Sequence, residues 1–514
     1  LKILIMIRFD LIVMLLLLIT SNIYSQDGIQ LEEYQTFPSY SDTGYDQDLR
    51  SQFHFSSIKG WNNDPNGMVF YNGEYHLYFQ HNPKSVNWGN MTWGHAVSKD
   101  MVHWEQLNHA ILPYRNGTIF SGTAIVDHNN SLGKNTDSKK AIVAFFTHAN
   151  NSWGDKNRPK QEPSWFYQSA AYSLDDGRTF NLINEGHGIV PNQGFDRGER
   201  DPKIMWHEET KKWILILWVK RGDDTFTGPN TGPGDAKKIG KVRFFESSDL
   251  INWRKLSDFD RNWVFECMDF VELAVDGDNS NKKWLLYDAS FDYEIGDFDG
   301  TEFVTDRQVG KGDYGNHYYA AQTFNNSPDE RTIIIGWMPT RDKNIFIDND
   351  MPWNQQMSFP CTMELRTTEN GIKLFRNPIR EIEKLYKNTY TYNNKSLSYV
   401  NRSLDKINPE LIDLSLNFKP IDNDEFKINI RGQEIIYKNQ HVEFQKTKIP
   451  AKPRNGKISI RVLLDRPSLE IFVNDGENVM TTYSVSDKNN TDVSLSSKRN
   501  MRINLKLNEL KSSW

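Results

Sequence analysis

Three acidic residues in separate parts of the chain have surroundings suited to acid–base chemistry. Asp64 stands directly before Pro65, and Asp201 stands before Pro202, so proline favours an extended backbone at each carboxylate. Glu266 lies among apolar and aromatic neighbours, where loss of water raises a carboxyl pKa and favours a proton donor at neutral pH. These acids are therefore candidates for one catalytic centre.

Each of the three acids also has a simpler structural interpretation. Asp64 alone would cap a turn, Asp201 would form an ion pair with Arg200, and Glu266 would face solvent at a strand edge. Such a pair with Arg200 is expected to keep Asp201 ionised. The case for chemistry depends on whether the fold brings the three residues together.

The segment around Asp64 indicates how this residue is presented. Asp64-Pro65-Asn66-Gly67 has the composition of a turn, and a strand, a tight turn at Asn72-Gly73 and a second strand follow it. The sequence therefore predicts that Asp64 lies in a turn at the mouth of a strand.

Short β-type runs separated by turns continue from residue 51 to about residue 374, and convincing amphipathic helices are nearly absent. The clearest predicted strands are 69–71, 75–79, 92–97, 141–146, 213–219, 283–287 and 332–337. A Ser-x-Asp turn followed by an aromatic residue recurs at 98–104, 173–180 and 247–253, at intervals of roughly 75 residues. Repeated four-stranded units predict a β-propeller, in which the three acids would converge at the axis.

A second domain follows a charged, partly helical segment at 379–385. Alternating strands at 426–430, 458–464 and 468–473, the last followed by an Asn-Asp-Gly turn, predict a β-sandwich. We therefore expect an all-β protein, with a propeller at 47–375 and a C-terminal sandwich at 385–514.

The N-terminus has the form of a secretory signal peptide, residues 1–26. Lys2 and Arg8 precede an apolar run at 11–19, and small polar residues follow it. Met6 is a candidate initiator, and no cysteine follows the apolar run as a lipid anchor would require. The sequence predicts a secreted or periplasmic protein without a stable membrane span after removal of this segment.

Composition narrows the class of ligand. The net charge is −6 at pH 7 without a basic block, which argues against a nucleic-acid partner. Aromatic residues reach 13%, which suits both stacking on sugars and the packing of many short strands. The histidines show no metal-ligand spacing, and a single bridge between the two cysteines, Cys267 and Cys361, stays open. No base is indicated beside Cys267, so we expect it to be a small buried side chain that fills space next to Glu266 and not a nucleophile.

Several motifs, in order along nearly the whole mature chain, resemble those of glycoside hydrolase family 32, the family of invertases, inulinases and levanases. They are Trp61–Gly67, Trp93–Ser98, Phe120-Ser121-Gly122, Arg200-Asp201-Pro202, Glu266–Asp269, Tyr318–Phe324, Gly336-Trp337-Met338 and Ser468–Glu477. The chain departs from the family pattern at Met268, where proline is usual, and at Cys361-Thr362, which interrupts a Pro-Arg-Glu-Leu stretch.

The resemblance implies a five-bladed propeller joined to a β-sandwich, and retaining hydrolysis of β-fructofuranosides without a cofactor or metal. It implies that Asp64 is the nucleophile, that Glu266 is the acid and then the base, and that Asp201 holds fructosyl hydroxyls and stabilises the transition state. The residues expected to line the fructosyl pocket are Trp61, Asn62, Asn63, Gln80, Trp88, Phe120, Ser121, Arg200 and Trp337. For Phe120 and Trp337, packing inside a blade is an equally good interpretation.

Three functions stay open at this point. The first is an exported hydrolase of fructans or sucrose, acting from chain ends or internally as an endo-levanase. The second is a fructosyltransferase that passes the same intermediate to a sugar, and the third is a sugar-binding protein without catalysis. The presence of all three acids weakens the third interpretation. The match of the pocket residues to a closed fructosyl site that accepts only a chain end predicts free fructose as the main product. Linkage preference and oligomeric state stay open.

Overall fold

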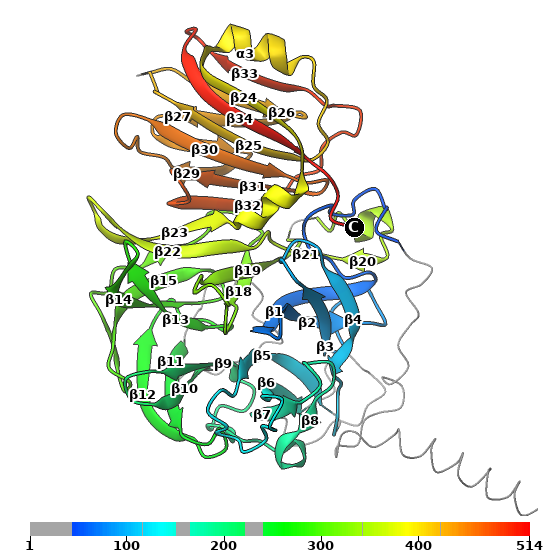
Figure 1. Cartoon of the computed structure of the whole chain (residues 1–514), viewed down its shortest axis with the longest axis vertical. Coiled ribbons are helices and arrows are strands. Elements are labelled where there is room, and N and C mark those ends of the chain that lie inside the picture. Colours follow the sequence, from blue (N-terminus) through cyan, green and yellow to red (C-terminus); the bar gives the residue numbers. More distant parts are fainter. Residues whose placement is uncertain (1–43, 116, 151–164, 221–239, 342, 422) are drawn as a thin grey trace, which may run out of the picture.

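The computed structural model describes residues 44–514 apart from 116, 151–164, 221–239, 342 and 422. The predicted signal peptide, residues 1–26, lies outside the described residues. Within the described ranges, no helix is both long and apolar enough to span a membrane. The protein is nearly all β-structure, arranged as a β-propeller and a β-sandwich stacked end to end (Figure 1).

Three sheets form the first part of the propeller. The first has the order β20-β1-β2-β3-β4, the second β5-β6-β7-β8 and the third β12-β11-β10-β9. The strands of these sheets are β1 (Gly60–Tyr71), β2 (Glu74–Asn82), β3 (Thr92–Ser98), β4 (Glu105–Ile111), β5 (Thr118–Val126), β6 (Ile142–Asn150), β7 (Trp165–Ser173), β8 (Asn181–Leu182), β9 (Glu199–His207), β10 (Lys212–Lys220), β11 (Gly240–Ser247), β12 (Arg254–Arg261) and β20 (Trp353–Asn354).

The rest of the propeller is one ten-stranded sheet with the main order β16-β15-β14-β13-β22-β19-β18. Its strands are β13 (Asp269–Val275), β14 (Asp278–Tyr287), β15 (Asp292–Phe298), β16 (Phe303–Thr305), β17 (Gly310–Lys311), β18 (Tyr319–Thr323), β19 (Ile333–Met338), β21 (Gln356–Met357), β22 (Cys361–Thr368) and β23 (Gly371–Pro378). The strands β1, β5, β9, β13 and β18 contact one another in that order, and β18 returns to contact β1. This closed ring of strands positions the site. The ten-stranded sheet is continuous and does not divide into separate blades, so the count of five blades stays a prediction.

The repeated Ser-x-Asp segments form similar turns in three sheets. The hydroxyl of Ser98 accepts hydrogen bonds from the backbone N–H groups of Asp100 (3.1 Å) and Met101 (2.8 Å), between β3 and β4. The hydroxyl of Ser247 does the same for Asp249 (3.2 Å) and for the residue after it, between β11 and β12. The turn at Ser173 between β7 and β8 is one residue longer, because its hydroxyl accepts from the N–H groups of Asp175 (3.3 Å) and Gly177 (2.9 Å). The internal repeat predicted from the sequence is therefore a structural repeat.

The C-terminal sandwich consists of two sheets with buried apolar residues between them. The six-stranded sheet has the order β24-β34-β25-β30-β31-β32, and the five-stranded sheet has the order β29-β28-β27-β26-β33. The strands are β24 (Tyr386–Ser396), β25 (Ile412–Phe418), β26 (Phe426–Ile430), β27 (Gln433–Lys438), β28 (His441–Phe444), β29 (Thr447–Pro450), β30 (Ile458–Leu464), β31 (Ser468–Val473), β32 (Asn478–Tyr483), β33 (Val493–Ser497) and β34 (Arg502–Leu510). One short helix, α3 (Leu397–Leu404), covers an edge.

The chain passes from propeller to sandwich between the end of β23 at Pro378 and the start of β24 at Tyr386. The connection contains a 3-10 helix, η3 (Arg380–Leu385), where the sequence predicted partial helicity. The domain limits 47–375 and 385–514 stay predictions. Every segment that the sequence predicted as a strand coincides with an observed strand to within one residue.

A buried ionic cluster joins the two parts. His54, which precedes the propeller, lies between two sandwich carboxylates, with Nδ1 2.8 Å from Asp465 and Nε2 3.3 Å from Glu470. Burial opposes the charge on His54, but its hydrogen bonds to both carboxylates and their charges outweigh burial and raise its pKa to about 9. Asp465 also accepts hydrogen bonds from the backbone N–H groups of Gln52 and Phe53. The charge of His54 is therefore paired with two hydrogen-bonded carboxylates where the propeller meets the sandwich.

Candidate active site

Asp64 lies within a continuous strand, so the predicted turn at residues 64–67 is wrong. β1 pairs with β2 along its whole length, with register shifts between Asn62 and Pro65 and between Asn66 and Val69. These irregularities take up the turn-forming residues while the strand keeps its pairing. The second predicted turn is confirmed, because Tyr71 pairs with Glu74 across the two-residue loop at 72–73.

The first irregularity brings consecutive side chains of β1 to the same side. Trp61 Nε1 donates to Asn63 Oδ1 at 2.7 Å, and Asn63 Nδ2 donates to Asp64 Oδ1 at 3.1 Å. Regular alternation would have placed Asn63 and Asp64 on opposite faces. Gly67 has φ +51°, and a Cβ there would come within 2.7 Å of the Trp93 ring, so glycine is needed to complete the bulged strand.

Three donors surround the carboxylate of Asp64. Ser121 Oγ donates to Oδ2 at 2.6 Å, the Cys267 thiol lies 3.4 Å from the same oxygen, and Asn63 supplies the third contact. Burial raises the pKa of Asp64, and the bonds from Ser121, Asn63 and Cys267 act in the opposite direction. Hydrogen bonds thus favour the ionised form in a site that otherwise disfavours charge.

Asp201 sits at the buried start of β9 in the left-handed backbone region, with φ 63°. Its own N–H donates to Thr147 Oγ1 at 2.9 Å, while its Oδ2 accepts from the backbone N–H of Cys267 at 3.0 Å. Burial raises its pKa to about 7, since the charges of Glu266 and Asp64 add to burial and exceed the opposing effect of Arg200. A strained conformation is thus held in place by Thr147 on β6 and by Cys267 in the loop before β13.

Glu266 lies in the loop before β13, where Glu266 and Cys267 both have positive φ, 27° and 44°. Arg200 Nε donates to Glu266 Oε2 at 2.8 Å, and the Tyr319 hydroxyl donates to Oε1 at 2.8 Å. Burial raises the pKa of Glu266 against the lowering effect of Arg200, and the charge of Asp64 raises it further. The sequence-based expectation of a raised pKa is confirmed.

Arg200 lies closer to Glu266 than to Asp201, the partner that the sequence predicted. Its guanidinium bonds to Glu266 at 2.8 Å, whereas its closest approach to Asp201 is 3.9 Å. It also lies over the rings of Trp218 and Phe265, at 4.7 and 5.5 Å from their centroids. Arg200 lowers the pKa of Asp201, as expected, but burial and the charges of Glu266 and Asp64 outweigh it, so Arg200 does not keep Asp201 fully ionised.

Cys267 is the residue that links the acids. Its thiol lies 3.4 Å from both Asp64 Oδ2 and Asp201 Oδ2, and it directly follows Glu266 in the chain. The three acids predicted from the sequence therefore meet around one cysteine. Burial raises the thiol pKa, which agrees with its predicted role as a buried, non-nucleophilic side chain. Both cysteines of the chain, Cys267 and Cys361, are free.

Sequence reasoning missed two contacts at the site. Cys267 was expected only to fill space, and Tyr319 was noted within a motif but given no role. The proximity of Cys267 to Glu266 in the sequence was a usable signal. Nothing local indicates that Tyr319 reaches Glu266, because Tyr319 begins β18 while Glu266 lies in the loop before β13, 53 positions earlier.

The predicted aromatic residues form two groups near the acids. Trp337 lies 6.3 Å from Trp61 and 6.0 Å from Tyr319 between ring centroids, in edge-on geometry. Trp88 lies 6.1 Å from Phe120, which directly precedes Ser121. Trp61, Trp337 and Phe120 are each only half-buried, so part of each ring is available to a ligand.

Gln80 reaches Asp64 through intermediates. The Asn66 amide is oriented so that its oxygen accepts from Gln80 Nε2 at 3.0 Å. In this orientation the Asn66 nitrogen donates to Ser121 Oγ at 3.3 Å, and the Ser121 hydroxyl donates to Asp64. Asn62 instead turns away, because it is fully buried and its Oδ1 accepts from Ser57 Oγ at 3.1 Å. The structure thus places Asn62 outside the group of side chains around the acids.

A second polar layer lies behind the acids. Lys203 Nζ is 3.0 Å from Asp269 Oδ2, and both side chains are almost fully buried. Asp269 also accepts from the Tyr287 hydroxyl at 2.9 Å and from the Thr323 N–H at 2.7 Å. Lys203 follows Asp201 by two positions on β9, so this network ties the strand that carries Asp201 to β13, β14 and β18.

Among the residues that the structure describes, the arrangement contains three carboxyl groups and one close cation, Arg200. Like charges in a shared buried site cannot all ionise at low cost, so the acids titrate as a coupled set. Such a set can hold one carboxylate and one protonated acid at the same pH. Cleavage of a glycosidic bond requires this combination, because one group must donate a proton while the other stays ionised.

The comparisons with known proteins cover both parts of the chain. Residues 54–378 match the family model described as Glycosyl hydrolases family 32 N-terminal domain, and residues 381–511 match Glycosyl hydrolases family 32 C terminal. The chain is 33% identical over 500 residues to a levanase of Bacillus subtilis (strain 168), covering 88% of this chain and 68% of the relative. It is 29% identical over 507 residues to an extracellular exo-inulinase of Aspergillus awamori, covering 85% of this chain and 89% of the relative.

A solved structure agrees with the fold. The crystal structure of exo-inulinase from Aspergillus awamori superimposes with a TM-score of 0.76 at 25% sequence identity, covering 92% of this chain and all of the other. The match extends over both the propeller and the sandwich. Together with the two family models, these similarities show that the chain belongs to glycosyl hydrolase family 32.

Proposed function

We propose that this enzyme hydrolyses β-fructofuranosidic bonds in fructans and sucrose and releases fructose. The observation that carries the proposal is the meeting of Asp64, Asp201 and Glu266 around Cys267, with Arg200 as their close cation. Membership of a family whose relatives include a levanase and an exo-inulinase supports this substrate class.

In the mechanism that we propose, Asp64 is the nucleophile. Its carboxylate accepts from Ser121 and Asn63, which favours the ionised form needed for attack on the anomeric carbon of the fructosyl unit. As that bond forms, the bond to the leaving oxygen breaks, and Glu266 transfers its proton to this oxygen. The products of the first step are a fructosyl ester of Asp64 and the shortened chain or glucose.

The second step reverses the proton transfer. Glu266, now a carboxylate beside Arg200 and Tyr319, takes a proton from water, and the water oxygen displaces Asp64 from the anomeric carbon. Two displacements at one carbon retain its configuration. Burial raises the pKa of Glu266, which supports its role as a proton donor near neutral pH.

Asp201 is proposed to hold fructosyl hydroxyl groups and to stabilise the transition state. Its pKa of about 7 leaves a mixture of protonated and ionised forms near neutral pH. The proposed fructosyl pocket consists of Trp61, Asn63, Gln80, Trp88, Phe120, Ser121, Arg200 and Trp337, with Gln80 acting through Asn66. Asn62 is proposed to support the β1 segment from behind, through its bond to Ser57.

Export of the enzyme is part of the proposal. The apolar run at 11–19 and its flanking residues support a signal peptide at 1–26, and the exo-inulinase relative is described as extracellular. A polymer such as levan or inulin is a suitable substrate for a protein that acts outside the cytoplasm.

Product analysis tests the proposed function. The purified enzyme is incubated separately with sucrose, levan and inulin, and the early products are resolved by chromatography. We expect free fructose as the main early product from each substrate that is cleaved. A ladder of oligosaccharides with little fructose would instead identify an endo-levanase, longer products from sucrose would identify a fructosyltransferase, and unchanged substrates would rule out the proposed function.

A further inference from the structure

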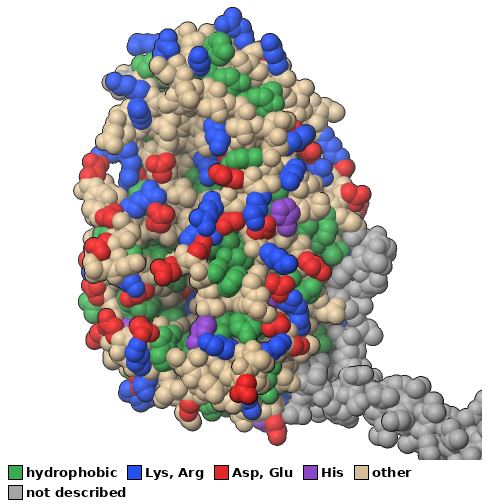
Figure 2. Space-filling view, in the orientation of Figure 1, with side chains coloured by type: hydrophobic (Ala, Val, Ile, Leu, Met, Phe, Trp, Pro, Cys, Tyr) green, Lys and Arg blue, Asp and Glu red, His purple; other side chains and the backbone are tan. Residues whose placement is uncertain are grey.

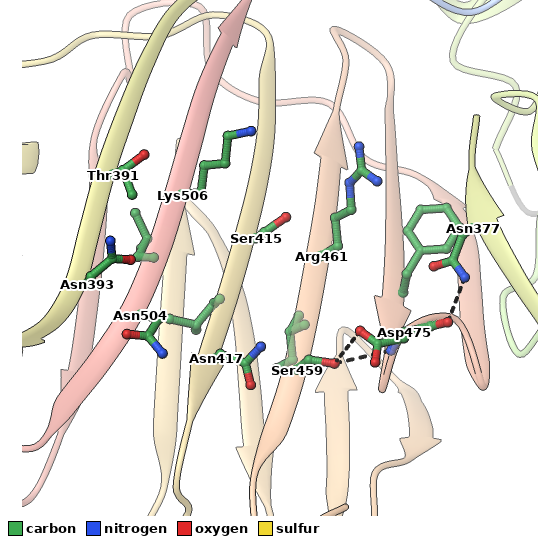
Figure 3. A pocket seen from close by; sticks show the side chains of 14 residues that line it. Asn377, Thr391, Asn393, Ser415, Asn417, Ser459, Arg461, Asp475, Asn504 and Lys506 are labelled. Carbon is green, nitrogen blue, oxygen red and sulfur yellow. Dashed lines mark hydrogen bonds between the residues drawn. The ribbon is translucent and has the colours of Figure 1, made fainter. Parts of the chain in front are cut away.

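The outer face of the six-stranded sandwich sheet contains a polar hollow far along the chain from the acids. Its volume is ≈ 420 Å³, within the range of about 300–1,000 Å³ typical of ligand pockets. The turn around Asp475 and the propeller residue Asn377 form one side, and Asn377 Nδ2 donates to the Asp475 carbonyl at 2.7 Å (Figure 3).

The floor of the hollow is built from alternate residues of four neighbouring strands. Each strand contributes two polar side chains at positions i and i+2, while the residues between them are directed to the core. These floor residues are Thr391 and Asn393 of β24, Asn504 and Lys506 of β34, Ser415 and Asn417 of β25, and Ser459 and Arg461 of β30.

Strand pairing arranges the floor in two rows. Asn417 lies opposite Asn504 on one neighbour and opposite Ser459 on the other. Ser415 lies opposite Lys506 and Arg461 in the same way. With strands about 4.8 Å apart, each row places a hydrogen-bonding group at nearly every strand across the sheet. Figure 3 shows the row of amides and hydroxyls running across the strands.

The charged groups of the hollow already have partners. Arg461 donates from Nε and Nη2 to the two carboxylate oxygens of Asp413, both at 2.8 Å. Lys506 Nζ lies 5.2 Å from the centroid of the Tyr386 ring, and Asp475 accepts from Ser459 at 3.2 Å. An anionic or cationic ligand would therefore have to displace existing contacts.

Four of the neutral floor groups remain available, whereas Asn504 accepts from the Asn394 N–H at 2.7 Å and Ser459 donates to Asp475. Among the described residues, none forms a hydrogen bond with the side chains of Thr391, Asn393, Ser415 or Asn417. The apolar residues of the lining are at most 2% exposed, namely Leu416, Ile460, Leu505 and Phe472. Protein interfaces usually bury apolar and aromatic side chains at their centre, and this floor offers none.

The geometry points to a binding site for a neutral, polyhydroxylated chain on this face. We assign it to the stem of a fructan molecule, meaning the part of the polymer that lies away from the end being cleaved. Amides and hydroxyls both donate and accept, which suits a ligand that carries many hydroxyl groups and no charge. Figure 2 shows acidic and basic side chains mixed over the propeller, whereas Lys and Arg predominate over the sandwich at the top of the view. The hollow itself is lined by charges of both signs, Arg461, Lys506 and Asp475, so its own lining does not select a charged polymer of one sign. This inference rests on the proposed function for its choice of sugar.

A second site on the same molecule has a kinetic consequence. It keeps a bound polymer near the enzyme between cleavage events, which raises the effective concentration of chain ends. Sucrose has no stem and gains nothing from such a site. The inference therefore predicts that the site lowers KM for the polymer but not for sucrose, and that it leaves kcat, which depends on the acids, unchanged.

Truncation of the floor tests the inference. The variant Ser415→Ala/Asn417→Ala removes two available polar groups from β25, and the matched control Asn429→Ala/Ser494→Ala removes the same residue types from a cross-strand pair on the other sheet. For levan or inulin we expect the floor variant to raise KM by about fivefold or more, the effect of one lost hydrogen bond. KM for sucrose and kcat for both substrates should stay within twofold, and the control should match the wild type.

Direct binding provides a second readout that does not depend on turnover. Asp64→Asn protein, with and without the floor substitutions, is run in native gels that contain levan, inulin or no polymer. We expect retardation by at least one polymer, and a smaller retardation with the floor substitutions but not with the control pair.

Several results would overturn the inference. It fails if the floor variant changes KM for sucrose and polymer equally, if it changes neither, or if the control pair has the same effect. It also fails if the wild type is a dimer in solution and the floor variant is a monomer, because the face would then be an interface between copies. If the wild type cleaves no fructoside, the proposed function fails, while retention in the gels still decides whether the face binds the polymer.

Discussion

Two buried carboxylate clusters in this protein differ in how their charges are compensated. At the acid cluster, Asp64, Asp201 and Glu266 share one close guanidinium, and the pKa of each acid is raised. At the junction of propeller and sandwich, Asp465 and Glu470 enclose His54, whose pKa is raised to about 9.

The junction also supplies more hydrogen bonds per carboxylate from the backbone. Asp465 accepts from the N–H groups of Gln52, Phe53 and Arg466, and Glu470 accepts from that of Phe359. At the acid cluster, Asp201 accepts one backbone N–H bond, from Cys267. Paired carboxylates stabilise a fold, whereas crowded carboxylates with few backbone donors keep the protonation states that chemistry uses. The comparison therefore predicts that one cluster controls activity and the other controls stability.

The largest expected effect is on activity, from Asp64→Asn. Loss of the nucleophile should lower kcat on every fructoside by about four orders of magnitude or more. Because the substitution removes one charge from a crowded set, the midpoint of thermal unfolding should stay the same or rise. The control Asp137→Asn, at an exposed position on the loop before β6, should change neither quantity. Residual activity within tenfold of the wild type would disprove the role of Asp64.

Glu266→Ala should separate the two steps of the reaction. Without the proton donor, kcat on sucrose should fall by about 10²–10⁴-fold. A nitrophenyl fructoside needs little protonation on departure, so we expect a burst of nitrophenol followed by slow turnover that azide accelerates. Stopped-flow absorbance measures the burst, and circular dichroism checks the fold. Loss of the burst as complete as in Asp64→Asn would show that the roles are assigned wrongly.

His54→Gln should affect stability and leave activity at 25 °C nearly unchanged. Raising the pKa of His54 from 6.5 to about 9 corresponds to about 3 kcal/mol of stability. This contribution is fully present below pH 6.5 and is lost as pH rises through about 9, because the folded state holds the proton more tightly. Denaturant unfolding at pH 6 and pH 10 should show this loss in the wild type but not in the variant.

A reversed result for His54→Gln would break the comparison. If kcat/KM on sucrose fell while the free energy of unfolding at pH 6 stayed the same, the junction cluster would serve activity and the division between the clusters would be wrong.

The smallest expected effect is a shift in the pH profile from Tyr319→Phe. We expect a bell, with the acidic limb set by ionisation of Asp64 and the alkaline limb by loss of the proton from Glu266. The Tyr319 hydroxyl stabilises the ionised form of Glu266 and lowers its pKa. Its removal should therefore move the alkaline limb of kcat/KM to higher pH, by about one unit or less.

Tyr390→Phe, on β24 of the sandwich, is the matched control for this shift and should leave the profile unchanged. An alkaline limb that moved to lower pH in Tyr319→Phe would show that another group sets it.

The elements that the sequence predicted well are those with local causes. The two-residue turn at 72–73 and the three Ser-x-Asp turns depend on residues within a few positions of one another. Strands predicted from alternation are present for the same reason. The segment 64–67 was misjudged because pairing with β2 overrides a local turn preference, which residue composition alone does not reveal.

By itself, the sequence determined the fold class, the strands and the three acids, because periodicity, turn chemistry and motif order are properties of the chain. Only the tertiary structure decided which groups meet. Cys267 reaches Asp64 across 203 positions, and Arg200, which lies over the rings of Trp218 and Phe265, comes closer to Glu266 (2.8 Å) than to Asp201 (3.9 Å). These contacts join different strands of the propeller ring, so their geometry depends on how the sheets close around it and on no single segment of sequence.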